Sequence, residues 1–401
     1  MEKPLLDTLW VLVASALVFL MQGGFMCLES GLTRQKNSIN VAMKNLSDLS
    51  ISVVFFWAFG FALMFGTSHA GIFGTDGFLF SVNGITFMSA FFLFQVMFCS
   101  TATTIMSGAV AGRMCFAGYL LVAVILSGII YPFFGHWVWN GLTEGVSRGW
   151  LGNLGFVDFA GSTVVHSIGG WVALAAVLIL GPRTGRFTAS TSFRRTSVPI
   201  ATLGVILLWF GWFGFNGGST LRFSDEVAGI ILNTVLSGAA GCMFALGIGW
   251  FIRGFAKVED MINGSLAGLV SITASCFAVS SIDAVVIGAL GGSVMFFSSL
   301  ALVRLQIDDA VGAIPVHLGA GIWGTLAVAL FGDPALIGTG LSWFSQLGVQ
   351  VLGVVVAFLW AFGVAYVLLK LLNALHPLRV SKKQEELGLN ISEHRVGLFE
   401  D

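Results

Sequence analysis

Two stretches of this chain decide its fold: Asp158-Phe-Ala-Gly-Ser-Thr-Val-Val-His166 and Asp309-Ala-Val-Gly-Ala-Ile-Pro-Val-His317. Both read D-x-x-G-x-x-x-V-H and both begin a long apolar run. In both, a glycine follows four residues after the histidine, Gly170 and Gly321. A histidine deep inside an apolar helix is costly and usually has a function. Two of them in matching positions of a repeat predict a paired site.

The whole chain is too apolar for a soluble protein. Of its 401 residues, 56% are hydrophobic and 10% are charged, and the mean hydropathy is +0.92. These values predict an all-α membrane protein that crosses the membrane many times. Eleven apolar runs are long enough to span it, at about 6–27, 41–65, 84–108, 115–134, 157–181, 197–217, 226–251, 261–279, 283–303, 311–332 and 343–373.

The basic residues predict the orientation. With eleven spans the two termini lie on opposite sides. If the C-terminus is cytoplasmic, all Lys and Arg residues except Lys3, Arg148 and Arg222 fall on the cytoplasmic side, which is 16 of 19. The positive-inside rule therefore favours N-out, C-in. We expect one transmembrane domain over residues 1–376 and a cytoplasmic tail over 377–401, in the inner (plasma) membrane.

The repeated stretch also predicts internal symmetry. The two D…H segments begin the fifth and tenth runs, and an offset of five spans reverses direction across the membrane, which is the pattern of an inverted repeat. We place the repeats at about 6–181 and 197–332, followed by a final helix at 343–373. Eight residues of helix rise ~12 Å, so the histidines can meet from opposite sides of a core ~30 Å thick. The alternative is that each histidine only bonds a neighbouring helix.

Three other segments are rich in aromatic residues. The sixth run contains Leu208-Trp-Phe-Gly-Trp-Phe-Gly-Phe-Asn-Gly-Gly-Ser219, which indicates either a helix end facing something other than lipid or an interfacial aromatic belt. Phe94 and Phe98 share one helix face, as core residues often do. His136-Trp-Val-Trp139 lies at an outer helix end.

No phosphate-loop or nucleophile motif stands out, and no Cys, Asp or Glu near the histidines completes a metal shell. We therefore expect no enzyme, cofactor or metal. The net charge of −1 is uninformative, and we expect no nucleic-acid partner.

Several long motifs resemble one known family. GFMCLESGLTRQKNSINVAMKNLSD, FLFQVMF, DFAGSTVVH, WFGWFGFNGGS, the stretch from Asp308 to Gly324 and the tail LRVSKKQEELGLNISEH are similar to the Amt branch of the Amt/Rh ammonium transporters. The resemblance runs from about residue 6 to 394. It implies a homotrimer in which each subunit is an eleven-helix bundle of two inverted halves around its own pore.

The resemblance also implies roles for an outer site and a gate. Trp139 and Ser219, with Phe94, resemble the outer ammonium-recruitment site, and we expect both Trp139 and Ser219 to be exposed at a vestibule. Phe98 and Phe215 resemble the stacked aromatic pair that closes the pore below it.

The pore residues follow from the same motifs. His166 and His317 resemble the twin pore histidines, and Asp158 resembles the carboxylate that shapes the outer vestibule from behind. These matches imply ammonium transport, with ammonium recruited at the outer site and deprotonated before passage past the histidines.

Three segments depart from the family pattern. The positions before the second histidine are Gly312, Ile314 and Pro315 instead of the usual Asp-x-Phe; the third run is followed by Ala111-Gly-Arg113 instead of Ala-Glu-Arg; and the loop from Trp139 to Asp158 is longer than usual. Proline tends to bend a helix, so we expect the inner exit to be affected.

These departures keep two further functions open. The chain also resembles Amt-like ammonium receptors, which signal through the C-terminal segment to a fused module with little or no transport. A cytoplasmic regulatory protein of the PII type is another candidate partner of the tail. A channel for carbon dioxide or a related neutral gas is less favoured, because the cation-recruiting site is intact.

Overall fold

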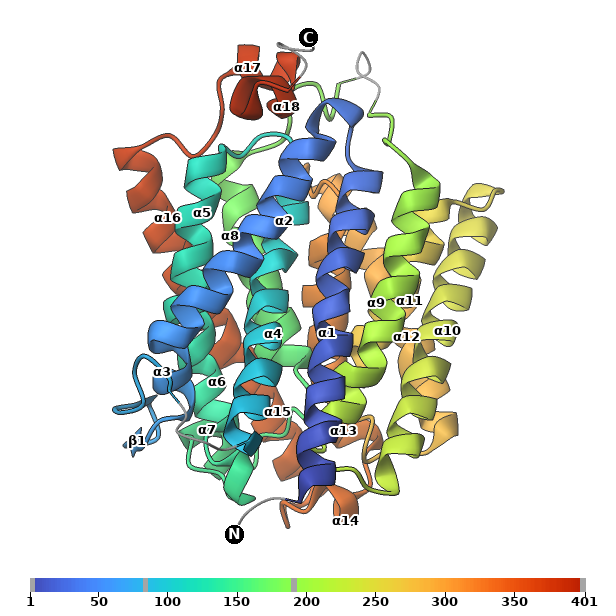
Figure 1. Ribbon diagram of the computed structural model, residues 1–401. Helices are drawn as coiled ribbons and strands as arrows, with labels where there is room; N and C mark the ends of the chain where they lie inside the picture. The colour runs from blue at the N-terminus through green and yellow to red at the C-terminus, as the bar shows by residue number, and fades with distance from the viewer. Residues whose placement is uncertain (1–3, 82–85, 189–192, 397–401) are drawn as a thin grey trace.

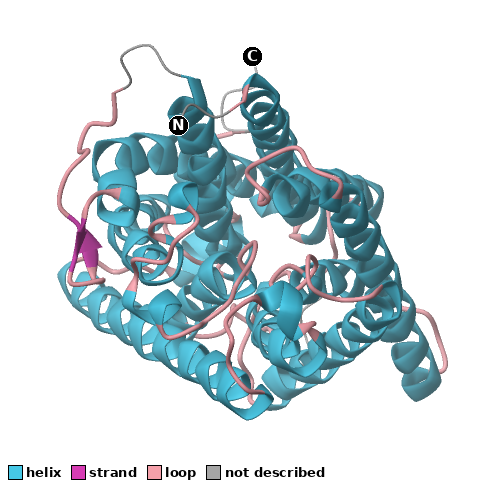
Figure 2. Ribbon diagram, turned by 90° about the horizontal axis from the view of Figure 1, so that it is seen from below, coloured by secondary structure: helices cyan, strands magenta, loops and turns pink. Residues whose placement is uncertain are grey.

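In a computed structural model, which describes residues 4–81, 86–188 and 193–396, the chain forms one bundle of long helices (Figure 1). We call the end at which the first helix starts the N-terminal face and the end that carries the last two short helices the C-terminal face. Seen from the N-terminal face, the long helices stand side by side around the interior, with a short hairpin at the periphery (Figure 2).

The first half of the bundle contains five membrane-crossing segments. They are α1 (Leu5–Leu32), α2 (Gln35–Phe55) continuing through η1 (Phe56–Gly60) into α3 (Phe61–Phe65), α4 (Thr86–Ala109), α5 (Phe116–Ile125) continuing through η2 (Leu126–Ile130) into α6 (Tyr131–Trp139), and η4 (Ser162–Ser167) continuing into α8 (Ile168–Leu180). Between them lie the antiparallel strands β1 (Ser68–His69) and β2 (Phe73–Gly74), in the register Ser68 to Gly74, and the short helices η3 (Leu142–Glu144) and α7 (Trp150–Asn153).

The second half repeats this order and is followed by a final helix. Its segments are α9 (Val198–Gly218), α10 (Glu226–Arg253), α11 (Val258–Ile272), α12 (Ser281–Arg304), and η5 (Ile314–Gly319) continuing into α13 (Ala320–Phe331). The short α14 (Pro334–Ile337) precedes the final span, α15 (Trp343–Ala357) with η6 (Phe358–Phe362) and α16 (Gly363–Leu375), and the tail forms α17 (Lys382–Leu387) and α18 (Leu389–His394).

The predicted fold class is confirmed. Within the described ranges, ten helical segments are long and apolar enough to cross a membrane, and α11, with 15 residues, is a shorter eleventh. The eighth run was expected to be helical to residue 279, which is wrong, because α11 ends at Ile272. The backbone groups that this ending releases are bonded by the segment before η4: the N–H of Ala160 donates to Thr273 O at 3.1 Å.

Glycines bring the two halves into close contact. The first helices of the halves, α1 and α9, pack along each other, and a Cβ on Gly204 of α9 would lie 2.4 Å from Leu28 N of α1. A Cβ on Gly31 of α1 would lie 2.6 Å from Ala201 N. Small residues allow this approach of two backbones in a membrane.

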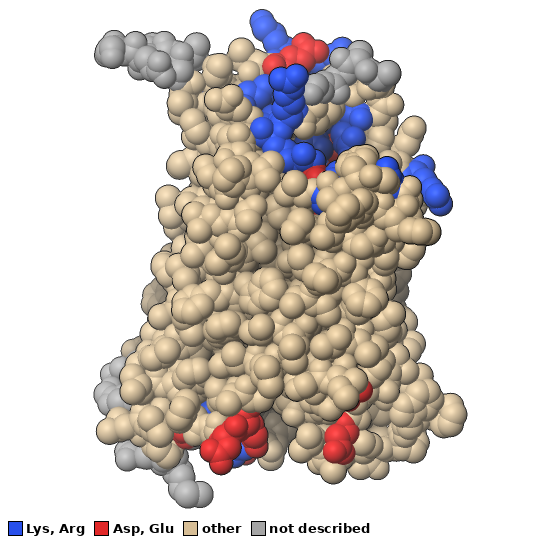
Figure 3. Space-filling model, turned by 90° about the vertical axis from the view of Figure 1, so that its right-hand side faces the viewer, with Lys and Arg blue, Asp and Glu red and all other residues tan. Residues whose placement is uncertain are grey.

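The charges divide between the two faces as predicted. On the side drawn in Figure 3, Lys and Arg gather at the C-terminal face and Asp and Glu are prominent at the opposite face. Arg148 and Arg222 follow α6 and α9, which both end at the N-terminal face. The positive-inside rule then assigns the C-terminal face to the cytoplasm.

Arg113, which follows the departure from the family pattern at Gly112, ties the C-terminal face together. Its side chain is fully buried, donates to the carbonyls of Ala109 and Gly181 at 2.9 Å each, and donates to the carbonyl of Asp308. Arg183 in turn donates from Nε and Nη2 to the Asp308 carboxylate, both at 2.7 Å. The ends of α4 and α8 are thereby fastened to the segment that leads into η5.

This clamp predicts a dependence of stability on pH. Burial raises the pKa of Asp308, but hydrogen bonds from Arg183 and the charges of Arg183 and Arg113 outweigh it, so the pKa lies well below its ordinary value. Such a carboxylate stabilises the fold fully above its unfolded pKa of about 4, and the contribution is lost as pH falls towards the folded pKa. We expect the melting temperature of the purified protein to fall between about pH 5 and about pH 3.

Asp308→Asn is the matching variant. It should melt lower than the unsubstituted protein at neutral pH and lose less on acidification, whereas Asp225→Asn, at an exposed side chain that accepts no capping bond, should change neither value. An acid profile identical in Asp308→Asn and the unsubstituted protein would remove Asp308 as its cause.

Candidate functional site

Both D-x-x-G stretches form the same cap at the start of a helix. The Asp158 carboxylate accepts three backbone N–H groups, the first from Gly161 at 3.0 Å. The Asp309 carboxylate accepts from Gly312 at 2.9 Å and from the residue two further on at 2.6 Å. The two glycines have φ of 117° and 87°, a backbone conformation that other residues adopt at a cost. The repeated D-x-x-G pattern therefore forms the same kind of helix start in both halves of the chain.

The two histidines follow these caps and meet in the interior. His166 lies in η4 and His317 in η5, both π-helical segments, a widened turn that is frequent at functional sites. Their Nδ1 atoms are 3.1 Å apart and their ring planes differ by 17°. A Cβ on Gly170 or Gly321 would lie 2.7 Å or 2.6 Å from the opposite segment, so these glycines allow the approach. The two histidines therefore lie together, as their matched spacing predicts.

One buried histidine nitrogen has no hydrogen-bond partner among the residues that the structure describes. His166 is fully buried, and its Nε2 makes no hydrogen bond with the part of the chain that the structure describes. Its ring stacks on Trp212 at 5.2 Å and on Phe215 at 5.5 Å between centroids. An unpaired buried polar atom is unfavourable and calls for an explanation, and the ring that carries it stacks on Phe215 of the aromatic pair described next.

Phe98 of α4 and Phe215 of α9 form a stacked pair. Their ring centroids are 4.0 Å apart with planes at 18°, and both side chains are buried. Phe94 contacts Phe98 at 4.6 Å, and Trp139 contacts it at 6.1 Å. The four aromatic side chains thus form one group next to His166. We call it the outer aromatic group.

Trp139 is buried, which corrects the expectation of an exposed tryptophan. Its side chain is 4% exposed, and its indole N–H donates to the carbonyl of Asp158 at 2.7 Å. Asp158 therefore joins the outer group to the helix that carries His166. The interfacial-belt interpretation also fails for Trp212 and Phe215, which are fully buried.

Ser219 is half-buried at the end of α9. Its hydroxyl donates to the carbonyl of Phe215 at 2.8 Å, so its oxygen lone pairs stay available as acceptors. The preceding residue packs against the Phe94 ring, since a Cβ on Gly218 would lie 2.8 Å from it. Ser219 is thus held beside the aromatic group.

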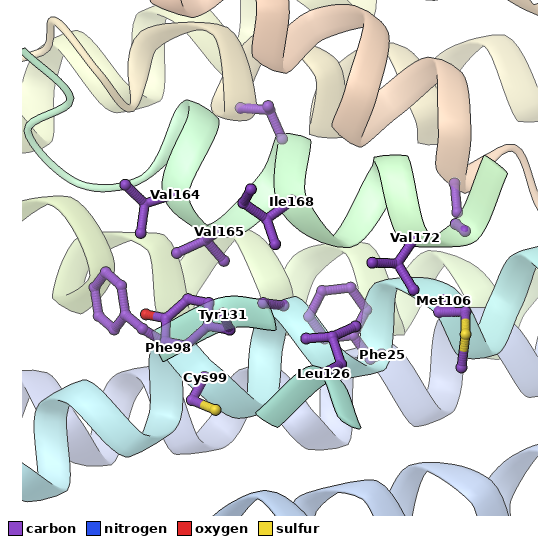
Figure 4. Packing of buried hydrophobic residues seen from close by; sticks show 14 of the residues in the cluster. Phe25, Phe98, Cys99, Met106, Leu126, Tyr131, Val164, Val165, Ile168 and Val172 are labelled. Atoms are coloured by element: carbon purple, nitrogen blue, oxygen red, sulfur yellow. The ribbon is translucent and has the colours of Figure 1, made fainter. Parts of the chain in front are cut away.

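The helix that carries His166 continues into an apolar region. Figure 4 shows Val165 and Ile168 extending from this helix towards Tyr131, with Phe98 and Phe25 nearby, and all of these residues are buried in the main core. No charged side chain is among them. An ion that entered here with its charge would lose its hydration without replacement.

Beyond His317 lies a very small cavity. It has a volume of about 10 Å³ and is lined by His317, Phe25, Glu29 and residues 311–313, among others. That volume is close to the space of one water molecule. It lies on the side of the histidines that leads to the C-terminal face.

Glu29 belongs to a buried polar network that the sequence interpretation missed. Glu29 is 2% exposed and accepts from Asn45 Nδ2 at 2.9 Å, which also donates to Ser107 at 3.0 Å. Lys44 and Asp48, which lie near Asn45 in α2, are also fully buried. The sequence does contain a sign of this network, because ionisable residues within apolar runs mark functional or paired groups.

Pro315 does not lie in a helix interior, where a proline tends to bend a helix. It stands in the first turn of η5, where a backbone N–H would have no partner within the helix and proline is well tolerated.

His136 is a core residue whose two ring nitrogens both have hydrogen-bond partners, Ser68 Oγ at 2.8 Å and the carbonyl of Met64 at 3.0 Å. Across the described ranges, no three His, Cys, Asp or Glu side chains come together as a metal site would need.

Comparisons with known proteins agree over nearly the whole chain. Residues 9–398 match the family described as the Ammonium Transporter Family. A putative ammonium transporter of Synechocystis sp. is 54% identical over 398 residues, covering 98% of this chain and 74% of the relative. Ammonium transporter Amt2 of Archaeoglobus fulgidus is 40% identical over 97% of this chain and 87% of the relative.

Solved structures share the fold. One described as a sensor Amt protein superposes with a TM-score of 0.92 at 43% identity, covering 97% of this chain and 98% of that one. Mep2 of Candida albicans superposes with a TM-score of 0.86 at 27% identity, covering 95% and 88%.

Proposed function

This chain belongs to the ammonium transporter family, and from that premise we propose that it transports ammonium by binding it at the outer aromatic group and deprotonating it before passage past the two histidines. Its relatives are membrane transporters and not enzymes, and the chain is a multi-pass membrane protein. The observation that carries the proposal is the unpartnered Nε2 of His166, buried beside the Phe98–Phe215 pair.

The outer group suits a small cation that donates hydrogen bonds. Phe94 and Trp139 offer aromatic faces, and a desolvated cation–π contact contributes about 1–2 kcal/mol. Ser219 supplies a hydrogen-bond acceptor. Asp158 adds negative charge behind Trp139, at a distance set by the indole bond to its carbonyl. Sodium and potassium ions would gain the charge attraction but cannot donate to Ser219.

Loss of a proton makes the apolar region passable. An ammonium ion between the phenylalanine pair and the histidines would be an uncompensated buried charge, whereas ammonia is neutral. His166 Nε2 can accept or bond the molecule that arrives, and the Nδ1 pair shares one proton between two neutral rings. Metal cations have no proton to lose, so the same chemistry excludes them.

A receptor is the second candidate. The likeness to the structure described as a sensor Amt protein supports it. The tail is seated on α2: Lys36 Nζ donates to the carbonyl of Glu385 at 2.8 Å, and Asn390 Oδ1 accepts from the N–H of Ile39 at 3.0 Å. A change in α2 would reach the tail through these bonds. Among the described residues, no observation favours a channel for a neutral gas.

The assembly and the cellular setting belong to the same proposal. We take residues 1–376 as the transport domain of a homotrimer in the inner (plasma) membrane and residues 377–401 as its cytoplasmic tail. The tail would meet a PII-type regulator or a fused signalling module. Native mass spectrometry of the purified protein tests the trimer, since a monomer would contradict it.

Trp139→Leu with Ser219→Ala tests the recruitment site. The double variant loses a cation–π contact and an acceptor, so ammonium binding should weaken about 10- to 100-fold. Binding is measured by calorimetry on purified protein, and its melting temperature is recorded because Trp139 is buried. Ser219→Ala alone, which leaves the core intact, should weaken binding about 10-fold.

Trp250→Leu is the matched control, because Trp250 is 55% exposed on α10. Its affinity should equal that of the unsubstituted protein. Full affinity in both Ser219→Ala and the double variant would remove these residues from the site.

A further inference from the structure

A cavity opens at the C-terminal face beside the end of the proposed path. Its volume is about 390 Å³, and its walls come from the ends of α1, α10, α11 and α12, from residues near Arg183 and Arg195, and from the segment before η5. Six basic side chains line it, Arg34, Arg183, Arg186, Arg195, Arg253 and Lys257. Figure 3 shows Lys and Arg side chains gathered around a hollow at this end of the molecule.

The acidic side chains at this cavity are already engaged. Three line it, Glu259, Asp260 and Asp309. Arg195 pairs with Glu259 and Arg253 with Asp260, and Asp309 caps η5 through backbone N–H groups. Asp308, just behind the wall, is bonded by Arg183 and Arg186. The cavity therefore has more positive than negative charge, and its acids leave two of its cations without a carboxylate.

Arg34 is the first of these cations. Its Nε is buried and makes no hydrogen bond within the described ranges, and its guanidinium lies 4.5 Å from the centroid of the Phe193 ring. Arg183 lies 4.9 Å from the same ring. Burial, and then the charge of Arg183, lower the pKa of Arg34. A guanidinium in this position is held at a cost, which a bound anion would offset.

Lys257 is the second. It stands exposed at the cavity in the turn between α10 and α11, and it makes no hydrogen bond or ion pair with the residues that the structure describes. The charges that most affect its pKa are all positive and lower it, after desolvation: Arg195, Arg253 and Arg186. Two cations without a carboxylate partner thus face one cavity from two different turns, α1–α2 and α10–α11.

We propose that this cavity binds a phosphate-bearing anion through Arg34 and Lys257. A guanidinium fork and a compact ammonium group are the pair of side chains that proteins use for phosphate. The volume is within the range of small-molecule sites and exceeds what a halide ion fills. The phosphate can belong to a soluble compound or to the headgroup of an anionic lipid at the membrane surface.

The site lies against the helix start that carries a pore histidine. Gly312 and Pro315 line the same cavity, and Pro315 precedes His317 by two residues. An occupant would therefore contact the cap of η5 and alter the charge at the inner exit. This inference does not rest on transport, because binding is measured without ammonium.

The test uses pyrophosphate as the soluble probe and phosphatidylglycerol as the lipid probe. Pyrophosphate binding is measured by calorimetry on the purified full chain, and lipid binding by native mass spectrometry after exchange into vesicles with and without phosphatidylglycerol. We expect one probe to bind and Arg34→Gln with Lys257→Gln to weaken it at least about 10-fold. Whichever probe binds identifies the source of the phosphate.

Two further variants keep the result decisive. Lys257→Gln alone changes only an exposed side chain and should weaken binding several-fold even if the double variant is unstable. Lys382→Gln with Lys383→Gln removes two charges from the same face outside the cavity and should leave binding unchanged. Absence of binding by both probes, or equal weakening in the tail variant, would overturn the proposal.

Discussion

Replacing His166 and His317 together with leucine should lower ammonium flux about 100-fold or more. Leucine has a similar size, so the helices can still pack, but it offers no nitrogen to accept a proton or to bond ammonia in the apolar region. The proton shared across the 3.1 Å contact between the Nδ1 atoms is lost at the same time. Flux is measured as the initial rate of ammonium-driven pH change in vesicles of purified, reconstituted protein.

His69→Leu is the control for this variant, because His69 is exposed in the peripheral hairpin. It should conduct as the unsubstituted protein does. The single variants His166→Leu and His317→Leu should fall between, since each leaves one acceptor. If the double leucine variant conducted at the full rate, the histidines would have no part in the passage of ammonia.

Replacing Asp158 with alanine should lower the free energy of unfolding by roughly 3–5 kcal/mol. The carboxylate is buried and accepts the N–H groups of Gly161, Thr163 and Val164 at 3.0, 2.8 and 2.8 Å. Alanine leaves all three donors buried without a partner at the start of η4. Denaturant unfolding of the purified protein in detergent, followed by tryptophan fluorescence, measures the change.

Two comparisons separate the cap from the negative charge. Asp158→Asn keeps one acceptor oxygen and should lose about half as much. Asp225→Ala removes an exposed carboxylate that caps nothing and should stay within about 0.5 kcal/mol of the unsubstituted protein. Equal stability of Asp158→Ala and Asp225→Ala would contradict the capping role.

Much of the architecture could be predicted because it depends on patterns within the chain. The inverted repeat follows from the offset of five spans between His166 and His317, and the orientation from the Lys and Arg residues. Phe98 and Phe215 could be named from their motifs. Their stacking is expected only from the family resemblance, because neither motif by itself contains how α4 and α9 lie.

Other features depend on contacts that no single segment encodes. Trp139 lies at a helix end, where a buried and an interfacial tryptophan have the same neighbours in sequence, and its burial follows from packing against Phe98 and Asp158. Residues 273–279 are as apolar as the membrane-crossing helices, yet α11 ends at Ile272. It can end there because the segment before η4 donates hydrogen bonds to the carbonyls that the helix end releases. Ionisable residues within the apolar runs point to a polar network at Glu29, but its partners come from α2 and α4, so only the fold shows which groups it joins.

Current recorded from the purified protein on a solid-supported membrane tests the central claim most directly. Pulses of ammonium should give a transient current that saturates with concentration, that sodium and potassium pulses of equal strength do not produce, and that Ser219→Ala shifts to higher ammonium concentration. Tight ammonium binding by the same preparation, without current and without a pH change in the vesicles, would contradict transport and favour the receptor.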